Sequence, residues 1–153
     1  MTIEARLNEL GIVLPEAAAP VASYVPVVVH GGLAFVSGQV SFVEGTLLKG
    51  RLGDDVSLED GMRAARGCGL MILAQLKAAL GSLDRVERVV KLGGFVNSTP
   101  DFTDQPKVVN GASDLMLEVF GEAGKHARAA VGVPSLPLGV AVEVDAIVAV
   151  SDG

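Results

Sequence analysis

The sequence contains no tryptophan, one tyrosine and five phenylalanines, so it has few aromatic side chains on which nucleic-acid bases could stack. Basic charge is also scarce: 12 lysines and arginines face 18 aspartates and glutamates, for a net charge of -6 at pH 7. No run of lysine or arginine supplies the local positive charge that phosphate neutralisation requires. Nucleic acid is therefore a poor candidate for a partner.

Cysteine, metal-ligand clusters and long apolar runs are scarce or missing as well. Cys68 is the single cysteine and cannot form an intrachain disulfide; we interpret it as a small buried hydrophobe in a reducing compartment, not as a catalytic thiol. Apolar segments end before the roughly 18 residues that a membrane span needs, and the N-terminus does not resemble a signal peptide. No His/Cys/Asp cluster has metal-ligand spacing, and no glycine-rich phosphate loop occurs. The sequence predicts a cytoplasmic protein without metal or cofactor.

Apolar residues are abundant: they make up 50% of the 153 residues, and the mean hydropathy is +0.48. The length fits one domain, residues 1–153, around one hydrophobic core. A monomer of this composition would expose large apolar patches, which usually mark interfaces. We therefore expect part of the apolar surface to lie in subunit contacts.

Three segments have the pattern of an amphipathic helix, with a capping residue at the start and glycine at the end. They span residues 2–11, 57–81 and 104–121. Prolines after the first helix predict an extended arm as far as residue 20. Gly61, Gly67 and Gly69 inside the second helix cost roughly 1 kcal/mol each against alanine, which indicates close approach to a sheet.

Apolar and β-branched residues predict strands between and after these helices. They span residues 25–30, 33–40, 46–48, 86–96, 128–133 and 140–150. Gly31 and Gly32 suit a tight turn between the first two strands, and Gly93 with Gly94 indicates a bulge or a close backbone approach. The last two strands are predicted to form a hairpin. The order of elements predicts an α+β fold, a mixed sheet with its two main helices on one face.

Three charged side chains stand inside the apolar C-terminal strands. Arg128 begins one strand, and in the other the alternation places Glu143 and Asp145 on the face opposite the valines. The predicted hairpin would bring Arg128 near Glu143, where each lowers the cost of burying the other. A structural ion pair and a functional site are both compatible with this spacing. His30 and His126 are interpreted as exposed or hydrogen-bonded polar residues.

The C-terminal pattern resembles that of a known family. Arg128-x-x-Val-x-Val-x-x-Leu-Pro137, followed by Val142-Glu-Val-Asp145, looks like the signature of the YjgF/RidA family, also known as endoribonuclease L-PSP-like. A tyrosine, Tyr24, thirteen residues before the serine of a Ser37-Gly-Gln segment adds to the resemblance. It implies a homotrimer of chorismate-mutase-like subunits around a central barrel, with clefts between neighbouring subunits. It also implies that small 2-imino or enamine acids are hydrolysed in these clefts to 2-keto acids and ammonia without a cofactor.

The resemblance also implies roles for individual residues. Arg128 matches the arginine that binds the substrate carboxylate, and Glu143 matches the acid that positions or activates water. Tyr24 matches the tyrosine that closes the cleft, and Ser37 and Gly38 match the segment that lines it.

One helix residue and one departure from the family pattern complete the comparison. Asn110 matches a helix asparagine of the site; for it, as for Ser37, a local turn or cap hydrogen bond is an equal alternative to ligand contact. Ala130 stands where some deaminases carry cysteine, and the N-terminal helix is an addition to the shorter deaminases. These differences predict a separate branch with its own pocket shape.

Three functions stay open at this point. The first is a cofactor-independent 2-imino acid deaminase, and the second is a non-catalytic trimer that binds small carboxylate metabolites through Arg128. The third, an endoribonuclease, is the least favoured because of the acidic charge balance.

Overall fold

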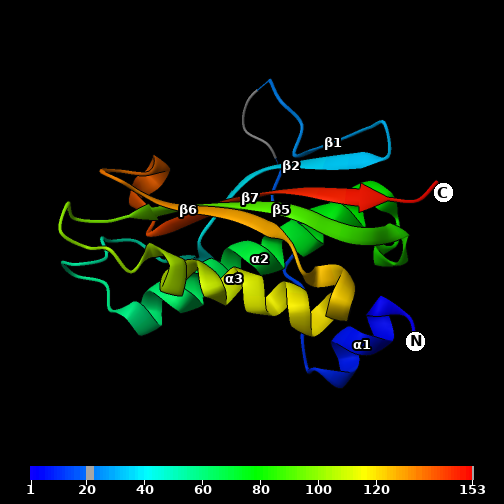
Figure 1. Cartoon of the computed structure of the whole chain (residues 1–153), viewed down its shortest axis with the longest axis horizontal. Helices are drawn as coiled ribbons and strands as arrows, with labels where there is room; N and C mark the ends of the chain where they lie inside the picture. Colours follow the sequence, from blue (N-terminus) through cyan, green and yellow to red (C-terminus); the bar gives the residue numbers. More distant parts are fainter. Residues whose placement is uncertain (20–22, 153) are drawn as a thin grey trace.

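The computed structural model describes residues 1–19 and 23–152, and it has two layers (Figure 1). One layer is a five-stranded sheet with strand order β1-β2-β7-β5-β6. Its strands are β1 (Val27–His30), β2 (Leu33–Val40), β5 (Val86–Asn97), β6 (Ala127–Val133) and β7 (Val142–Val150). Helices α2 (Leu58–Leu80) and α3 (Gln105–Phe120) form the second layer on one face of the sheet. The predicted α+β fold with a mixed sheet is confirmed.

Smaller elements surround the two layers. They are α1 (Ile3–Glu9), the hairpin of β3 (Phe42–Val43) and β4 (Thr46–Leu47), and the 3-10 helices η1 (Leu83–Arg85), η2 (Gly121–Gly124) and η3 (Pro137–Gly139). The arm that follows α1 is tied to α2 by a hydrogen bond from Gln75 Nε2 to the carbonyl of Ala18 (2.7 Å). Residue 20, the last of the predicted arm, lies outside the described residues. None of the described helices is long and apolar enough to cross a bilayer.

Side-chain caps mark the starts of α1 and α2. The hydroxyl of Thr2 accepts from the N–H of Ala5, and that of Ser57 accepts from the N–H of Asp60. Asp104 precedes α3 as predicted, but its side chain makes no capping hydrogen bond. These caps explain why the starts of α1 and α2 could be predicted from local sequence.

The predicted C-terminal hairpin is wrong. β6 pairs with β5 in parallel, whereas β7 pairs antiparallel with β5 on one side and with β2 on the other. The physical reason is the connection between β5 and β6: it contains α3, and a helical crossover returns the chain parallel to the strand it left. The final strand then fills the position between β2 and β5, in the middle of the sheet.

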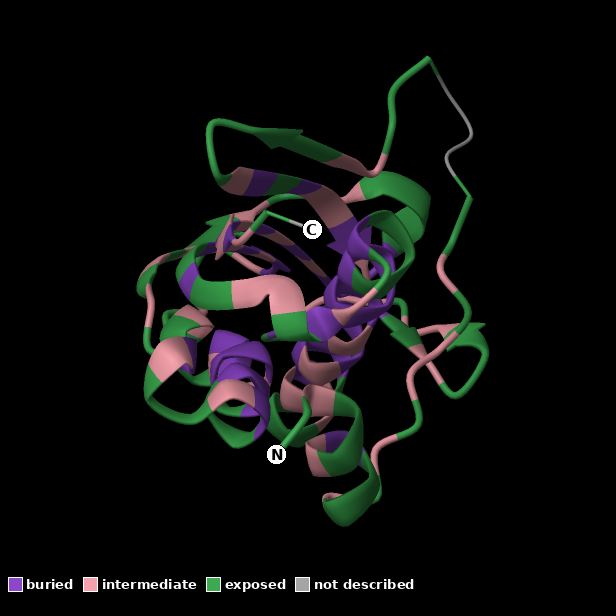
Figure 2. Cartoon of the chain, turned by 90° about the vertical axis from the view of Figure 1, so that its right-hand side faces the viewer, coloured by how far each residue is buried: buried purple, intermediate pink, exposed green. Residues whose placement is uncertain are grey.

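The alternation in β7 gives the sheet two different faces. Val142, Val144, Ala146, Val148 and Val150 are buried against the helices, as predicted. The opposite side, which we call the open face, carries cross-strand neighbours from the other strands. Figure 2 shows that much of the buried part of the chain lies in the helices. The residues of the open face include Phe35, Phe95, Val131, Glu143, Asp145 and Ile147. Phe35 and Val131 are 42% and 46% exposed there, so the open face is rich in apolar surface.

The glycine pair of β5 is a place of close approach and not a bulge. Gly93 and Gly94 continue the regular register with β6 and β7, and the irregular steps lie earlier, between Val86 and Lys91. A Cβ at Gly94 would overlap the side chain of Val109 on α3. The absence of a side chain therefore lets α3 lie close to the sheet.

Glycines inside α2 and α3 allow close contact between these two helices and with the β3–β4 hairpin, more than between α2 and the main sheet. A Cβ at Gly69 of α2 would touch Leu115 of α3, and one at Gly67 would touch the carbonyl of Phe42 in the β3–β4 hairpin. The tightest contact is at Gly111 of α3, where a Cβ would overlap the main-chain carbonyl of Met62. The expectation that these glycines face a sheet is thus only partly right, because α3 and the small hairpin are the main neighbours.

Gly111→Ala is expected to destabilise the chain by about 1–3 kcal/mol, because the added methyl group meets main-chain atoms of α2 that no rotamer change can move. The gain in helix propensity, roughly 1 kcal/mol, offsets only part of this cost. Thermal unfolding measures the difference. Asp114→Ala, on the exposed side of the same helix, is the control and should stay within about 0.5 kcal/mol of wild type. Equal stability of the two variants would contradict the tight α2–α3 contact.

Candidate functional site

Arg128 is held by α3. It lies on the edge strand β6 opposite the buried Leu92, so its side chain points to the helix side of the sheet. Its Nη1 group donates to Oδ1 of Asn110 (2.8 Å) and to Oγ of Ser113 (3.1 Å). Asn110 lies inside α3 and not at its cap, and its side chain contacts the predicted carboxylate-binding residue directly.

The outer edge of the same guanidinium has no protein partner in the described part of the chain. The ion pairs among the described residues involve other arginines and lysines and not Arg128. The side-chain hydrogen bonds of Arg128 to described residues come from Nη1, so Nε and Nη2 donate to none of them. A guanidinium presents Nε and Nη2 as a planar fork that matches the two oxygens of a carboxylate. Arg128 is half-buried, so an anion on this fork would be partly shielded from water.

Glu143 lies on the open face, in the middle of the sheet. Its carboxylate packs over Gly38 of β2, where a Cβ would overlap Oε2 of Glu143. Gly38 therefore provides the space that this side chain occupies. Partial burial raises the pKa of Glu143, and the negative charge of Asp145 raises it further. A carboxyl group with a raised pKa holds a proton more readily than an ordinary one, which suits it to proton transfer.

Asp145 forms an acidic pair with Glu143 on the open face. Burial raises the pKa of Asp145, while a hydrogen bond from the backbone of Gly93 and the positive charge of Lys91 act in the opposite direction. A hollow of about 460 Å³ lies on this face, and Asp145, Lys91 and Ser37 line it. The open face thus combines apolar surface with two carboxyl groups.

Tyr24 and Ser37 lie near the opposite edge of the sheet from Arg128. The side chain of Tyr24 is 52% exposed and precedes β1. The hydroxyl of Ser37 donates to the carbonyl of Val25 (3.2 Å), and its N–H donates to the carbonyl of Pro26 (2.9 Å). The hydroxyl of Ser37 thus bonds to a segment twelve residues earlier and not within a local turn or cap, and the bond fixes the backbone that follows Tyr24.

The predicted site residues therefore form two half-sites in one chain. We call Arg128 with Asn110 the arginine half-site, and Glu143 with Tyr24, Ser37 and Gly38 the glutamate half-site. The arginine half-site lies at the β6 edge and the segment after Tyr24 leads into β1, the other edge. At about 4.8 Å per strand, the two edges are roughly 19 Å apart, and Glu143, on the middle strand β7, lies two strands from Arg128.

The predicted contact between Arg128 and Glu143 is wrong. β5 lies between their strands, Arg128 points to the helices, and Glu143 points to the open face. The error follows from the hairpin prediction, since only direct pairing of β6 with β7 would have placed the two residues side by side. An ion pair within one chain is thereby excluded.

Ser113 and His126 contact the arginine half-site and were not predicted as part of it. His126 Nε2 lies 2.9 Å from Ser113 Oγ, and His126 Nδ1 lies 2.6 Å from the carbonyl of Gly124. The interpretation of His126 as a hydrogen-bonded polar residue is confirmed. For Ser113 a sequence signal existed: it follows Asn110 by three positions, so both lie on one face of α3.

Other reactive side chains lie outside both half-sites. Cys68 is fully buried, and burial strongly raises the pKa of its thiol, with the charge of Glu143 as a smaller cause. It is the buried hydrophobe that the sequence predicts. His30 is exposed on β1. Within residues 1–19 and 23–152, no group of three or more His, Cys, Asp or Glu side chains could hold a metal ion.

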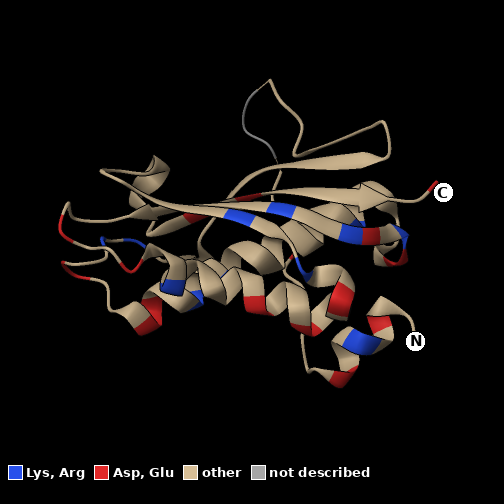
Figure 3. Ribbon diagram, viewed as in Figure 1, with Lys and Arg blue, Asp and Glu red and all other residues tan. Residues whose placement is uncertain are grey.

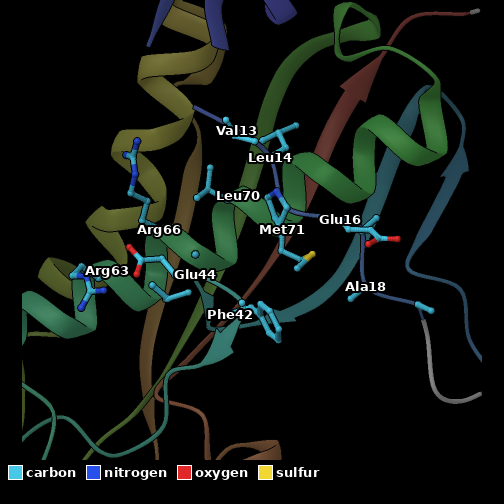
Figure 4. A pocket seen from close by; sticks show the side chains of 16 residues that line it. Val13, Leu14, Glu16, Ala18, Phe42, Glu44, Arg63, Arg66, Leu70 and Met71 are labelled. Atoms are coloured by element: carbon cyan, nitrogen blue, oxygen red, sulfur yellow. The ribbon is translucent and has the colours of Figure 1, made fainter. Parts of the chain in front are cut away.

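A cavity of about 970 Å³ lies between the N-terminal arm, the β3–β4 hairpin and α2 (Figure 4). Its lining is mainly apolar and includes none of the predicted site residues. Its arginines are paired, Arg63 with Asp60 (3.0 Å) and Arg66 with Glu118 (3.2 Å). Across the helical layer, basic and acidic groups are interspersed (Figure 3). No unpaired cation among the lining residues marks this cavity as an anion site.

Comparisons with known proteins agree with this architecture. The model of the family described as "YjgF/chorismate mutase-like, putative endoribonuclease" matches residues 4–148. Protein TCP17 of Trypanosoma cruzi is 55% identical over 148 residues, which are 95% of this chain and 92% of that protein. A crystal structure of a protein of unknown function from Agrobacterium tumefaciens is 50% identical with a TM-score of 0.90, covering 97% of this chain and 92% of its own. One from Shewanella oneidensis is 38% identical with a TM-score of 0.93, covering 98% and 100%. The chain therefore belongs to the YjgF family.

Proposed function

We propose that the protein hydrolyses small 2-imino acids and their enamine tautomers to 2-keto acids and ammonia, at a cleft between copies of the chain in a homotrimer. The observation that carries the proposal is the free Nε and Nη2 fork of Arg128, with Nη1 held from behind by Asn110 and Ser113. A half-buried guanidinium without a carboxylate partner is a ready site for the carboxylate of a small acid.

The reaction needs a bound carboxylate, a water molecule near C2 and a group that moves protons. Arg128 holds the carboxylate, and Glu143 accepts a proton from the water as its oxygen bonds to C2. Glu143 passes that proton to the imine nitrogen, which gives a carbinolamine. It next takes the hydroxyl proton and returns it to the nitrogen while the C–N bond breaks. Keto acid and ammonia leave, and Glu143 ends in its starting state, so no cofactor is consumed.

The separation of the two half-sites supports a site shared between chains. Arg128 lies on the edge strand β6 and faces the helices, whereas Glu143 lies two strands away in β7 and faces the open side, so one copy can present its arginine half-site to the glutamate half-site of the next. Such head-to-tail contacts are heterologous, and they close into a ring when the rotation between copies allows it. A trimeric ring would complete three identical clefts and cover the apolar open face. Light scattering should give three times the chain mass of 15.6 kDa.

Hybrid trimers test the shared site. Arg128→Ala and Glu143→Gln chains, co-expressed with different affinity tags, should each be inactive alone but regain activity together. In randomly mixed trimers about one quarter of the clefts combine an intact Arg128 with an intact Glu143 from the neighbouring chain. Ammonia release from freshly generated 2-iminobutanoate measures the activity.

The controls separate assembly from catalysis. Purification through both tags selects the hybrids. A chain that carries both substitutions, co-expressed in two differently tagged forms, should stay inactive. Hybrids no more active than their parents would show that the two residues do not meet between neighbouring chains. Binding of 2-oxobutanoate without any turnover would instead favour a non-catalytic carboxylate-binding protein.

A further inference from the structure

A directional hydrogen-bond chain runs behind the arginine half-site. It leads from Arg128 Nη1 to Ser113 Oγ (3.1 Å), from Ser113 Oγ to His126 Nε2 (2.9 Å), and from His126 Nδ1 to the carbonyl of Gly124 (2.6 Å). The link from Arg128 Nη1 to Asn110 Oδ1 branches from its first member.

The chemistry of the four groups determines which atom donates at each step. A guanidinium only donates, so Ser113 Oγ accepts from Arg128. A carbonyl only accepts, so His126 Nδ1 carries the proton and donates to Gly124. In a neutral imidazole Nε2 then accepts, and the hydroxyl of Ser113 donates to it. With this tautomer, Ser113 accepts from Arg128 and donates to His126.

The far end of the chain is anchored in packed structure. Gly124 is buried, and a Cβ there would overlap the main-chain carbonyl of Met116 on α3. Ser113 is 8% exposed, so water does not compete readily for its hydroxyl. The series of hydrogen bonds thus connects the long, flexible side chain of Arg128 to a backbone carbonyl whose position is fixed by η2 and α3.

We propose that Ser113 and His126 are positioning residues for Arg128: the histidine orients the serine hydroxyl, and the serine with Asn110 orients the guanidinium. Two acceptors on Nη1 stop rotation about the Nε–Cζ bond and direct the Nε and Nη2 fork outward. The inference extends the proposed function, on which it rests for the identity of the bound group as a carboxylate. Orientation of Arg128 itself is independent of that function.

Nuclear magnetic resonance of ¹⁵N-labelled protein tests the orientation without any ligand. Wild type should show separate, slowly exchanging guanidinium signals for Arg128, assigned through their loss in Arg128→Lys. Ser113→Ala and His126→Ala should merge them, whereas Ser113→Thr, which keeps a hydroxyl, should retain them. His30→Ala, at an exposed histidine on β1, is the matched control and should leave them unchanged.

Titration with 2-oxobutanoate gives the functional readout. Ser113→Ala should weaken the binding of 2-oxobutanoate on the order of tenfold, which is the effect of one hydrogen bond to a charged group. In turnover assays the same variant should raise KM more than it lowers kcat. Unchanged Arg128 signals in both alanine variants would overturn the positioning role. Merged signals in a protein that binds no 2-oxobutanoate, even as wild type, would support the positioning role and refute the proposed function.

Discussion

Arg128→Ala is expected to lower kcat/KM for 2-iminobutanoate by about 100-fold or more. Each charge-assisted hydrogen bond from the fork to the carboxylate contributes about 1.5–3 kcal/mol, and the variant loses two of them. Arg128→Lys should recover only part of the activity, because an ammonium restores the charge but not the planar fork. Initial rates of ammonia release at several substrate concentrations separate the loss in KM from the loss in kcat.

The same variant should fold nearly as well as wild type. Glu143 lies on the other side of the sheet, and none of the ion pairs among the described residues involves Arg128, so its removal separates no carboxylate of residues 1–19 and 23–152 from a partner. The half-buried Asn110 and the buried Ser113 lose a donor, which costs about 1–3 kcal/mol. Thermal unfolding of the preparation used for kinetics provides the check. A well-folded variant with wild-type turnover would remove Arg128 from the site.

Glu143→Gln is expected to lower kcat by about 100-fold or more while raising the thermal stability at pH 7. The kinetic loss follows from the missing proton acceptor, since general acid–base groups contribute roughly 10²–10⁴-fold. Glutamine keeps the shape of the side chain over Gly38, so the loss of the ionisable group is the cause of both effects. If Glu143 only supported the structure, its replacement would not be expected to lower activity while raising stability.

The sign of the stability change follows from the raised pKa of Glu143. The folded chain prefers the neutral acid, and this preference stabilises it fully below the unfolded pKa of about 4.3 and is lost as pH rises through the folded pKa. Above the folded pKa the ionised carboxylate opposes folding, and glutamine removes that cost. The gain should be about 1 kcal/mol or less, because solvent screens a half-exposed charge, and it should vanish near pH 4. A gain that persists at pH 4 would contradict this explanation.

Local sequence rules predicted most elements of the fold but not β3 or the pairing of the C-terminal strands. Caps at Thr2 and Ser57, and the turn at Gly31 and Gly32 with φ of 61° and 77°, depend on neighbouring residues only, so they were predictable. The partner of β6 depends on where α3 packs, which alternation within a strand does not report. A strand, a helix and a strand in succession favour a parallel crossover, and this signal was present in residues 86–133.

The candidate site divides in the same way between predictable and unpredictable parts. Arg128 and Glu143 were identified through a family motif, because an arginine and a glutamate in apolar strands need a special reason to be there. Their placement in separate half-sites required the strand order. Ser113 and His126 belong to no recognised sequence motif. Their contact with Arg128 depends on the distance between α3 and β6, which no short stretch of sequence encodes.

That distance has a mechanical consequence. Gly111 lies between Asn110 and Ser113, so one turn of α3 touches the main chain of α2 on one side and holds Arg128 on the other. Helix axes packed through glycine lie at the short end of the usual 8–10 Å range. No side chain lies between the two helices at this contact, so α3 can shift little toward α2. The distance from α2 to Arg128 is therefore held nearly constant by α3. The position of the guanidinium is thus referenced to the core of the subunit, although Arg128 itself belongs to an edge strand.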